Sequence, residues 1–426
     1  MTAVAERHEA VIAQFEAFRR DPAFGTGSHR DRREAAFGRF LERGFPTTRD
    51  EDWKFTNVAP IAATPFVRAG QPAVPPAALK PFLFPGIGHQ IVLVNGRLSA
   101  GLSSIDRLPA GVTVRALIDA APGGESLPGR TAFADLNEAF AESTVVIEIA
   151  PKTVVTEPLH LINLTVAEAK PTLVLPRVRV TIGEAAQVSL VESYAGLGEA
   201  NTLTTAVTLI DLGPGAVADH VKLQRESSQA YHLANVVIRL SRASTFSSYA
   251  LTFGGRIARN DITAVLGGEG AECTLDGLYV VDGETLVDTH TTIDHAMPHC
   301  PSHEVYKGIL AGRARAVFNG KIIVRPDAQK TDAKQTNKAL LLTDDAQINT
   351  KPQLEIFADD VKCTHGAAIG QLDEDAMFYL RARGIGPLEA RNFLIHAFAG
   401  EVLDEIKIPV VRDTAMRLME QKLLLG

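Results

Sequence analysis

Hydrophobic and polar positions follow three successive patterns along the chain. Up to about residue 90 the apolar residues recur at helical spacing, as Val4, Val11, Ile12, Phe15 and Phe18, and then as Phe37, Phe40 and Leu41. Gly44 and Pro46 are expected to end the second helix. Residues 71–86 contain five prolines, which predict a stiff linker. We therefore expect an N-terminal helical region with a Pro-rich linker over residues 1–90.

The second pattern, over residues 91–370, predicts strands. Apolar residues come in short runs rich in Val, Ile and Thr, and the runs are broken by Gly, Asp and Pro. Residues 178–182 alternate with a period of two, as a half-buried strand does. Only Thr131–Glu142 predicts a helix here, with Phe133, Leu136 and Phe140 on one face.

A weak repeat runs through this second region. A copy has an apolar residue, three turn-like residues, a small residue, any residue and usually another apolar one. The copies start at Ile182, Leu212, Leu240, Leu266, Leu310 and Leu342, and the copy at Leu266 has one extra residue before its small residue Ala271. Successive starts lie 30, 28, 26, 44 and 32 residues apart. Such periods with short strands predict a parallel β-helix, in which the small residue fits inside a corner. The gap of 44 residues predicts an insertion. An antiparallel sandwich with chance similarity between its turns is the alternative.

The third pattern, over residues 371–426, is helical. Asp373 is a good N-cap, Gly384 is expected to end that helix, and Pro387 suits the first position of the next one. A broad apolar stripe follows, formed by Phe393, Leu394, Ala397, Phe398, Val402 and Leu403. Helices this apolar need cover, either from the end of the β-helix or from a partner chain.

Composition narrows the classes of protein. The chain of 426 residues has 46% hydrophobic and 22% charged residues, which is ordinary for a globular protein. Its net charge of −7 and the lack of a long basic run argue against nucleic acid as a partner. No apolar run predicts a membrane span or a secretory signal. Three irregularly spaced cysteines do not predict a disulfide framework, so we expect a cytoplasmic protein.

The most prominent group of candidate ligands is His290, His295, His299, Cys300 and His303. Imidazole and thiolate groups suit zinc, copper or iron, although this spacing matches no closed zinc module. A metal-dependent enzyme using residues 290–303 is therefore one hypothesis. The alternative is a polar insertion loop whose histidines hydrogen-bond to neighbouring coils. A β-helix enzyme acting on polysaccharides is a weaker reading, because no acidic cleft motif accompanies it.

A second candidate site is the pair Cys363 and His365. Side chains two residues apart in a strand point to the same face, so this thiol and imidazole could share a metal or accept sulfur. The alternative is that Cys363 is a small buried hydrophobe, as free cysteines often are. The chain has no phosphate-binding loop of the Walker type, so it should not hydrolyse nucleotides itself.

The residues around this pair resemble a known family. Asp359–Ala367 is strongly similar to the SufB/SufD family of scaffolds for iron–sulfur cluster assembly, and four more segments match it: Glu51–Thr56, Leu136–Phe140, Thr331–Gln335 and Phe378–Ile385. The resemblance spans nearly the whole chain. Where SufB-type chains carry Glu-His-Glu-Ala, this chain has Thr364, His365, Gly366 and Ala367, which indicates the SufD branch.

The resemblance implies a mainly β fold: a right-handed parallel β-helix with helical regions at both termini. It implies a non-enzymatic scaffold that pairs with a SufB-like paralogue, with a transient nascent cluster at the interface near His365 and Cys363. It also implies that a SufC-like ATPase docks on the C-terminal helices, where our candidates are Phe393, Leu394, Phe398 and Val402. Whether reduced flavin binds the complex, whether the chain forms a homodimer alone, and which cluster type is built all stay open.

Overall fold

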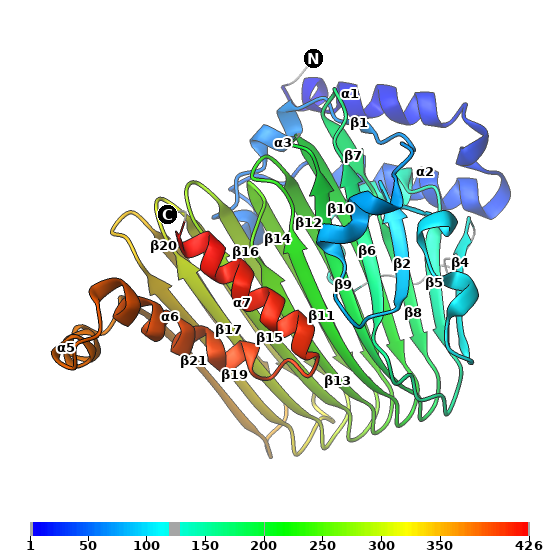
Figure 1. The fold of residues 1–426 in the computed structure, drawn as a ribbon. Coiled ribbons are helices and arrows are strands. Elements are labelled where there is room, and N and C mark those ends of the chain that lie inside the picture. Colours follow the sequence, from blue (N-terminus) through cyan, green and yellow to red (C-terminus); the bar gives the residue numbers. More distant parts are fainter. Residues whose placement is uncertain (1–2, 119–127, 200, 425–426) are drawn as a thin grey trace.

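The centre of the molecule is a long parallel β-helix (Figure 1). The structure is a computed structural model that describes residues 3–118, 128–199 and 201–424. Sheet A contains β1 (Val67–Arg68), β4 (Val112–Leu117), β5 (Thr144–Ile149), β7 (Thr172–Val174), β8 (Arg177–Ile182), β10 (Thr202–Leu212), β12 (Tyr231–Leu240), β14 (Ile257–Leu266), β16 (Leu286–His295), β18 (Arg315–Val324) and β20 (Gln347–Ile356). Sheet B contains β2 (His89–Val94), β3 (Arg97–Leu98), β6 (Leu159–Val166), β9 (Gln187–Leu197), β11 (Val217–Arg225), β13 (Thr245–Thr252), β15 (Glu272–Val281), β17 (Pro301–Leu310), β19 (Asp332–Leu341) and β21 (Lys362–Gly370).

From β8 onward the chain alternates between the two sheets, so one strand of each makes a coil. The strand order is β20-β18-β16-β14-β12-β10-β8-β5-β4 in sheet A and β21-β19-β17-β15-β13-β11-β9-β6-β2-β3 in sheet B. Neighbouring strands are parallel except for β2 with β3 and β4 with β5. The expected parallel β-helix with terminal helices is therefore confirmed, and the antiparallel sandwich is not observed.

Helices occupy the two ends of the sequence and one place between them. The α-helices are α1 (Ala3–Phe18), α2 (Gly27–Arg43), α3 (Ala59–Ala63), α4 (Ala132–Phe140), α5 (Glu374–Ala382), α6 (Pro387–Leu403) and α7 (Pro409–Leu424). Short 3-10 turns are η1 (Pro22–Phe24), η2 (Glu51–Trp53), η3 (Pro76–Phe82), η4 (Ala100–Leu102) and η5 (Ile105–Arg107). Asp373 caps α5 as expected, because its carboxylate accepts hydrogen bonds from the backbone N–H groups of Asp375 and Ala376.

The sequence repeat marks the corners of the coils. Its small residues are buried, with at most 4% exposed, as expected where a larger side chain would not fit. The first four copies lie at the corner from sheet A to sheet B, whereas the copies at Leu310 and Leu342 lie at the opposite corner. The 44-residue gap therefore contains no insertion, and that prediction was wrong. The missing copy begins at His295, with Cys300 as its buried corner residue.

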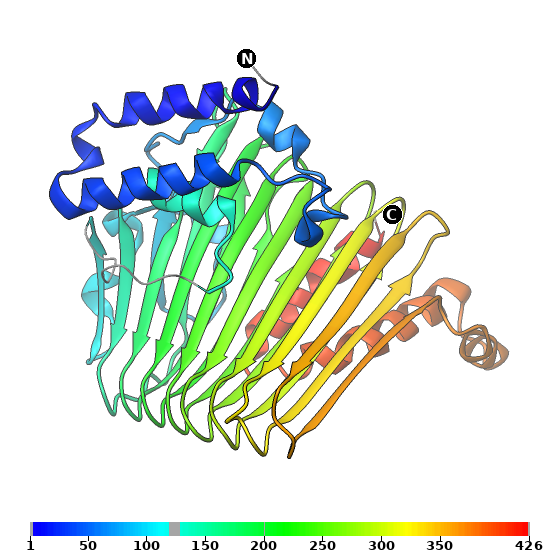
Figure 2. The same ribbon diagram turned by 180° about the vertical axis from the view of Figure 1, so that it is seen from behind.

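The N-terminal helices cover the outer face of sheet A near the start of the β-helix (Figure 2). Trp53 is buried there beneath the Arg259 guanidinium, which lies 3.8 Å from the ring centroid. Arg259 donates a 2.7 Å hydrogen bond to the carbonyl of Asp52, and the Thr56 hydroxyl donates at 2.6 Å to the Asp288 carboxylate. The motif at Glu51–Thr56 thus docks the N-terminal region onto the strands.

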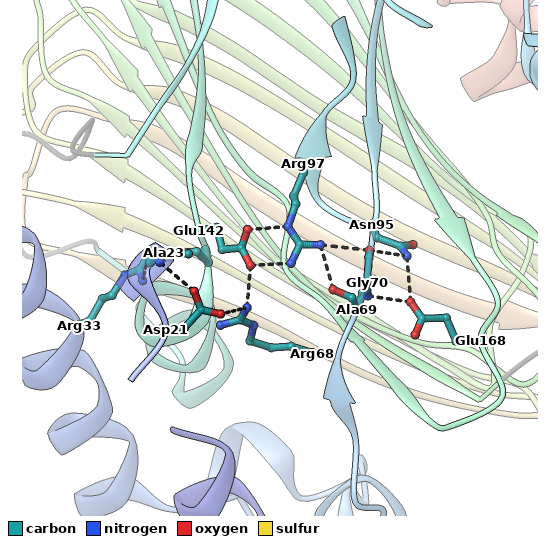
Figure 3. Close-up of polar contacts among 11 residues, drawn as sticks. Asp21, Ala23, Arg33, Arg68, Ala69, Gly70, Asn95, Arg97, Glu142 and Glu168 are labelled. Atoms are coloured by element: carbon teal, nitrogen blue, oxygen red, sulfur yellow. Dashed lines mark hydrogen bonds and ion pairs between the residues drawn. The ribbon is translucent and has the colours of Figure 1, made fainter. Parts of the chain in front are cut away.

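A polar network ties residues 68–70 to the first strands of the β-helix (Figure 3). Arg97 from β3 makes two hydrogen bonds to Glu142, at 2.6 and 2.5 Å, and Arg68 adds a third at 2.7 Å. Hydrogen bonds from Arg97 and the charges of both arginines outweigh partial burial and lower the pKa of Glu142. The Pro-rich segment is also packed, since Leu79 of η3 lies in an apolar cluster with β2 and β6.

The C-terminal helices α6 and α7 lie across the outer face of sheet B (Figure 1). Their buried side chains include Ile395, Ala399 and Val411, which pack against strand residues such as Leu251 and Leu278. The apolar stripe of α6 is therefore covered largely by the outer surface of a sheet, rather than by the end of the β-helix. Helix α5 has no buried residue, and it extends away from the strands (Figure 2).

Candidate functional site

The last coil of the β-helix is uncovered. Strand β20 pairs only with β18, and β21 pairs only with β19, so each sheet ends in a long free edge within the described residues. Side chains that would be interior in a longer β-helix are exposed here, including Ile356 and Ile369 with exposed fractions of 39% and 49%. We call this last coil, residues 347–370, the open end.

His365 and Cys363 lie on β21 at the open end, and both point toward the axis of the β-helix. The register pairs Cys363 with Ala333 and His365 with Gln335, and both of these β19 residues are buried in the interior. Parallel strands in register place paired side chains on the same face, so the expected common face for Cys363 and His365 is confirmed. The His365 side chain is exposed because no further coil covers it.

Cys363 is half-buried against the apolar cluster that contains Val324 and Ala333. Burial raises the pKa of its thiol and the nearby Asp332 carboxylate adds to this effect, while a hydrogen bond from the Ala333 backbone opposes it. The thiol form is therefore favoured in the free chain. A thiolate, which is the form that binds metal, would need a cation nearby.

The group at residues 290–303 does not form one site. His295 and Cys300 are buried, and the His295 Nε2 lies 3.0 Å from the Ser302 hydroxyl. Burial lowers the pKa of His295 to about 4, while nearby Asp294 and a Cys300 backbone hydrogen bond oppose that effect, so this imidazole is neutral at pH 7. Cys300 fills its corner and donates to the carbonyl of Gly268 at 3.4 Å.

The other three histidines of this group face different surroundings. His290 lies on the outer face of sheet A, where its Nε2 is 3.0 Å from the Asp288 carboxylate. His299 and His303 are exposed, and His299 occupies a left-handed backbone position in the corner. Among the described residues, no group of three or more His, Cys, Asp or Glu side chains could hold a metal ion. The metalloenzyme hypothesis therefore has no supporting geometry.

Exposed apolar side chains gather on α5 and α6, beside the open end. Of the four expected docking residues, Phe393 is exposed, Leu394 and Phe398 are half-buried, and Val402 is fully buried against the other helices and sheet B. The most exposed large apolar side chains on these two helices are Phe378, Tyr379 and Leu388, which we did not name as docking residues. Their helical spacing alone could not identify them, because burial depends on the orientation of each helix.

Buried ionisable side chains in the interior were also missed by the sequence analysis. Glu192, His220, Lys222 and Glu226 all lie inside the β-helix. The Nε2 of His220 is 3.1 Å from the Glu192 carboxylate. This hydrogen bond and the charges of His220 and Lys222 outweigh burial and lower the pKa of Glu192 to about 2. The alternation of β11 could have suggested inward polar residues, but not their partners.

These features define a class: a parallel β-helix protein with one uncovered end. Residues 164–398 match the family model described as "SUF system FeS cluster assembly, SufBD core domain". A SufBD family protein for iron–sulfur cluster assembly from Synechocystis is 35% identical over 382 residues, covering 85% of this chain and 84% of the relative. The iron–sulfur cluster assembly protein SufD from Escherichia coli is 31% identical over 386 residues, covering 90% of each chain.

The chain therefore belongs to the SufBD family of iron–sulfur cluster assembly proteins. The resemblance to SufD that residues 359–367 indicated is confirmed over most of the chain. A shorter match is to a SufBD family protein from Mycobacterium leprae, which is 32% identical over 240 residues, covering 51% of this chain and 61% of the relative. Separately, no described helix is long and apolar enough to cross a membrane.

Proposed function

We propose that this chain is a non-enzymatic, cytoplasmic SufD-type subunit that pairs with a SufB-like paralogue through its open end. The observation that carries the proposal is the uncovered coil itself, which exposes His365 next to Cys363. A nascent iron–sulfur cluster would form there as the cargo of the assembly, with His365 as the ligand from this chain. Neutral imidazole is a suitable ligand for iron, and a thiolate adds a softer one.

The free edges support pairing with another chain. β20 has ten residues and β21 has nine, and in each strand alternate residues direct their N–H and C=O groups to the free edge, where they offer hydrogen bonds to an incoming strand. Adding strands to such an edge is a common mode of recognition. A partner coil would also cover Ile356, Phe357 and Ile369, which are now exposed. A second copy of this chain is the competing partner when the SufB-like paralogue is absent.

A SufC-like ATPase would dock on the exposed apolar side chains of α5 and α6. We define the helical patch as Phe378, Tyr379, Leu388 and Phe393, each at least 49% exposed. Exposed aromatic and other large apolar side chains are typical of protein interfaces. Energy from ATP hydrolysis would then come from the partner, since this chain carries no Walker-type loop. Reduced flavin is not required by this proposal.

The decisive experiment compares His365→Ala with His303→Ala in a complex reconstituted from this chain, the SufB-like paralogue and the SufC-like ATPase. Both side chains are exposed, but His303 lies on the outer face of β17, two strands from β21. We expect the His365→Ala complex to assemble and hydrolyse ATP while its iron and sulfide content falls sharply. His303→Ala should retain both, and Cys363→Ala should cause a smaller loss. Equal cluster loading in wild type and His365→Ala would refute the assigned ligand.

The ATPase contact needs point variants rather than truncation. Removing residues 387–426 would uncover the apolar outer face of sheet B that α6 and α7 now bury, so such a chain should misfold or aggregate. Replacing Phe378 and Leu388 by Ser changes only exposed side chains. We expect this double variant to keep its melting temperature and lose binding to the SufC-like ATPase. Unchanged ATPase binding would exclude the helical patch as the contact.

A further inference from the structure

A column of polar side chains runs inside the β-helix toward the open end. The registers of β17, β19 and β21 align Glu304 with Gln335 and Gln335 with His365. Glu304 and Gln335 are buried, with exposed fractions of 0% and 2%, whereas His365 ends the column in the open. Adjacent side chains of such a column are separated by about 5 Å along the β-helix, which is within reach of a glutamine carboxamide.

Gln335 is held at one end and unpaired at the other. Its Nε2 donates a 2.6 Å hydrogen bond to the Glu304 carboxylate, on the side away from the open end. Its Oε1 is buried and has no hydrogen-bond partner among the described residues. Across the interior, Gly320 leaves room for the carboxamide, because a Cβ there would collide with Gln335. A buried acceptor without a partner is rare and invites a functional explanation.

We propose that Gln335, oriented by Glu304, is a positioning residue for His365. When a partner covers the open end, the Gln335 Oε1 accepts the N–H of one ring nitrogen of His365. That hydrogen bond selects one tautomer of the neutral imidazole and directs the other nitrogen, with its lone pair, toward the interface. The inference rests on the proposed role of His365 as an iron ligand, and it explains why the column ends at that residue.

The test uses the reconstituted complex and a matched pair of variants. Gln335→Leu removes the carboxamide. The matched variant Gln224→Leu removes an equally buried carboxamide, whose Nε2 donates to Glu226 at 3.1 Å and which lies on β11, four strands from Gln335 in sheet B. The readouts are the iron and sulfide content and the rate at which a chelator removes iron. We expect Gln335→Leu to lose iron about tenfold faster, as for other residues that orient ligands, and Gln224→Leu to match wild type.

A swapped pair separates positioning from packing. In Glu304→Gln/Gln335→Glu the two side chains still share a hydrogen bond, and residue 335 still presents an oxygen to His365. We expect this double variant to retain iron nearly as well as wild type, and all variants to keep ATP hydrolysis and assembly. A swap as defective as Gln335→Leu would overturn the inference and indicate a packing role.

The outcomes also distinguish the inference from the proposed function. If His365→Ala loses the cluster and Gln335→Leu retains iron like wild type, the positioning role is refuted while the ligand role stands. If His365→Ala retains the cluster, the ligand role itself fails, and the positioning role falls with it. The proposal is supported if His365→Ala and Gln335→Leu both lose iron while the double variant Glu304→Gln/Gln335→Glu retains it.

Discussion

The two ends of the β-helix are built in opposite ways. At the first coils the interior residues Ile91 and Leu93 are fully buried, and the half-buried Leu98, Leu108 and Val114 pack over that core. Short antiparallel strands, β3 and β4, close the sheets there, and we call these first coils the closed end. At the last coil, β20 and β21 have free edges and Ile369 is 49% exposed.

The difference shows how one fold both blocks and permits association. A short or antiparallel edge strand with charged side chains offers little backbone to an incoming chain, whereas a long free edge is a template for pairing. The interior side chains also differ, because they are apolar at the first coils and polar near the open end. Ile147 and Val180 line the first coils, while Glu304, Gln335 and Asn337 line the coils next to the open end. The closed end favours stability, and the open end keeps polar groups where we place the chemistry.

The largest expected effect concerns the network that ties down the closed end. Glu142→Ala would leave Arg68 and Arg97 partly buried without their shared carboxylate, and we expect a loss of about 3 to 4 kcal/mol in the free energy of unfolding. Glu148→Ala breaks a pair with Arg115 that is largely exposed, and it should cost less than about 1 kcal/mol. Denaturant unfolding measures both. Similar losses would mean that the network of Figure 3 does not hold this end.

The polar interior near the open end should make stability depend on pH. Burial raises the pKa of Glu304 to about 7, and the hydrogen bond from Gln335 opposes this effect. Because the folded state holds this proton more tightly than the unfolded state, the free energy of unfolding falls as pH rises from about 4.5 to about 7. A difference of about 2.5 pKa units corresponds to about 3 kcal/mol.

Glu304→Gln should remove that dependence, since glutamine does not titrate. The measurement is urea unfolding of both chains at several pH values between 4.5 and 8. Asp276, whose pKa burial also raises to about 7, remains in both chains and serves as an internal control for the residual slope. Parallel stability curves for the variant and wild type would show that Glu304 carries no such penalty.

The free edge itself should be sensitive to proline. The N–H of Lys362 donates to Thr331 of the neighbouring chain segment, so by alternation the N–H of Ala367 points to the free edge. Ala367→Pro should weaken pairing with the SufB-like partner about tenfold, equivalent to about 1.4 kcal/mol, while the melting temperature changes little. Ala368→Pro should instead break the ladder with β19 and destabilise the chain. Unchanged pairing for Ala367→Pro would show that β21 is not extended by a partner strand.

Much of the architecture could be predicted because its signals are local. Asp373, Gly384 and Pro387 mark helix boundaries through the conformations that their own backbones and side chains favour. Small residues such as Ala216 and Ala271 mark corners, because a larger side chain would not fit inside the bend between two strands. His365 and Cys363 share a face because a strand alternates its side chains.

What only the tertiary structure decided depends on distant parts of the chain. The residues 290–303 look like one cluster in the sequence, yet Cys300 fills a corner while His290 and His303 face the outsides of different sheets. Val402 belongs to the same apolar stripe as Phe393, but only the placement of α6 on sheet B buries one and exposes the other. The link from Glu304 through Gln335 toward His365 joins residues about 30 positions apart. Spacing along the chain encodes local geometry, whereas burial and partnership depend on which coil, sheet or helix comes to lie alongside.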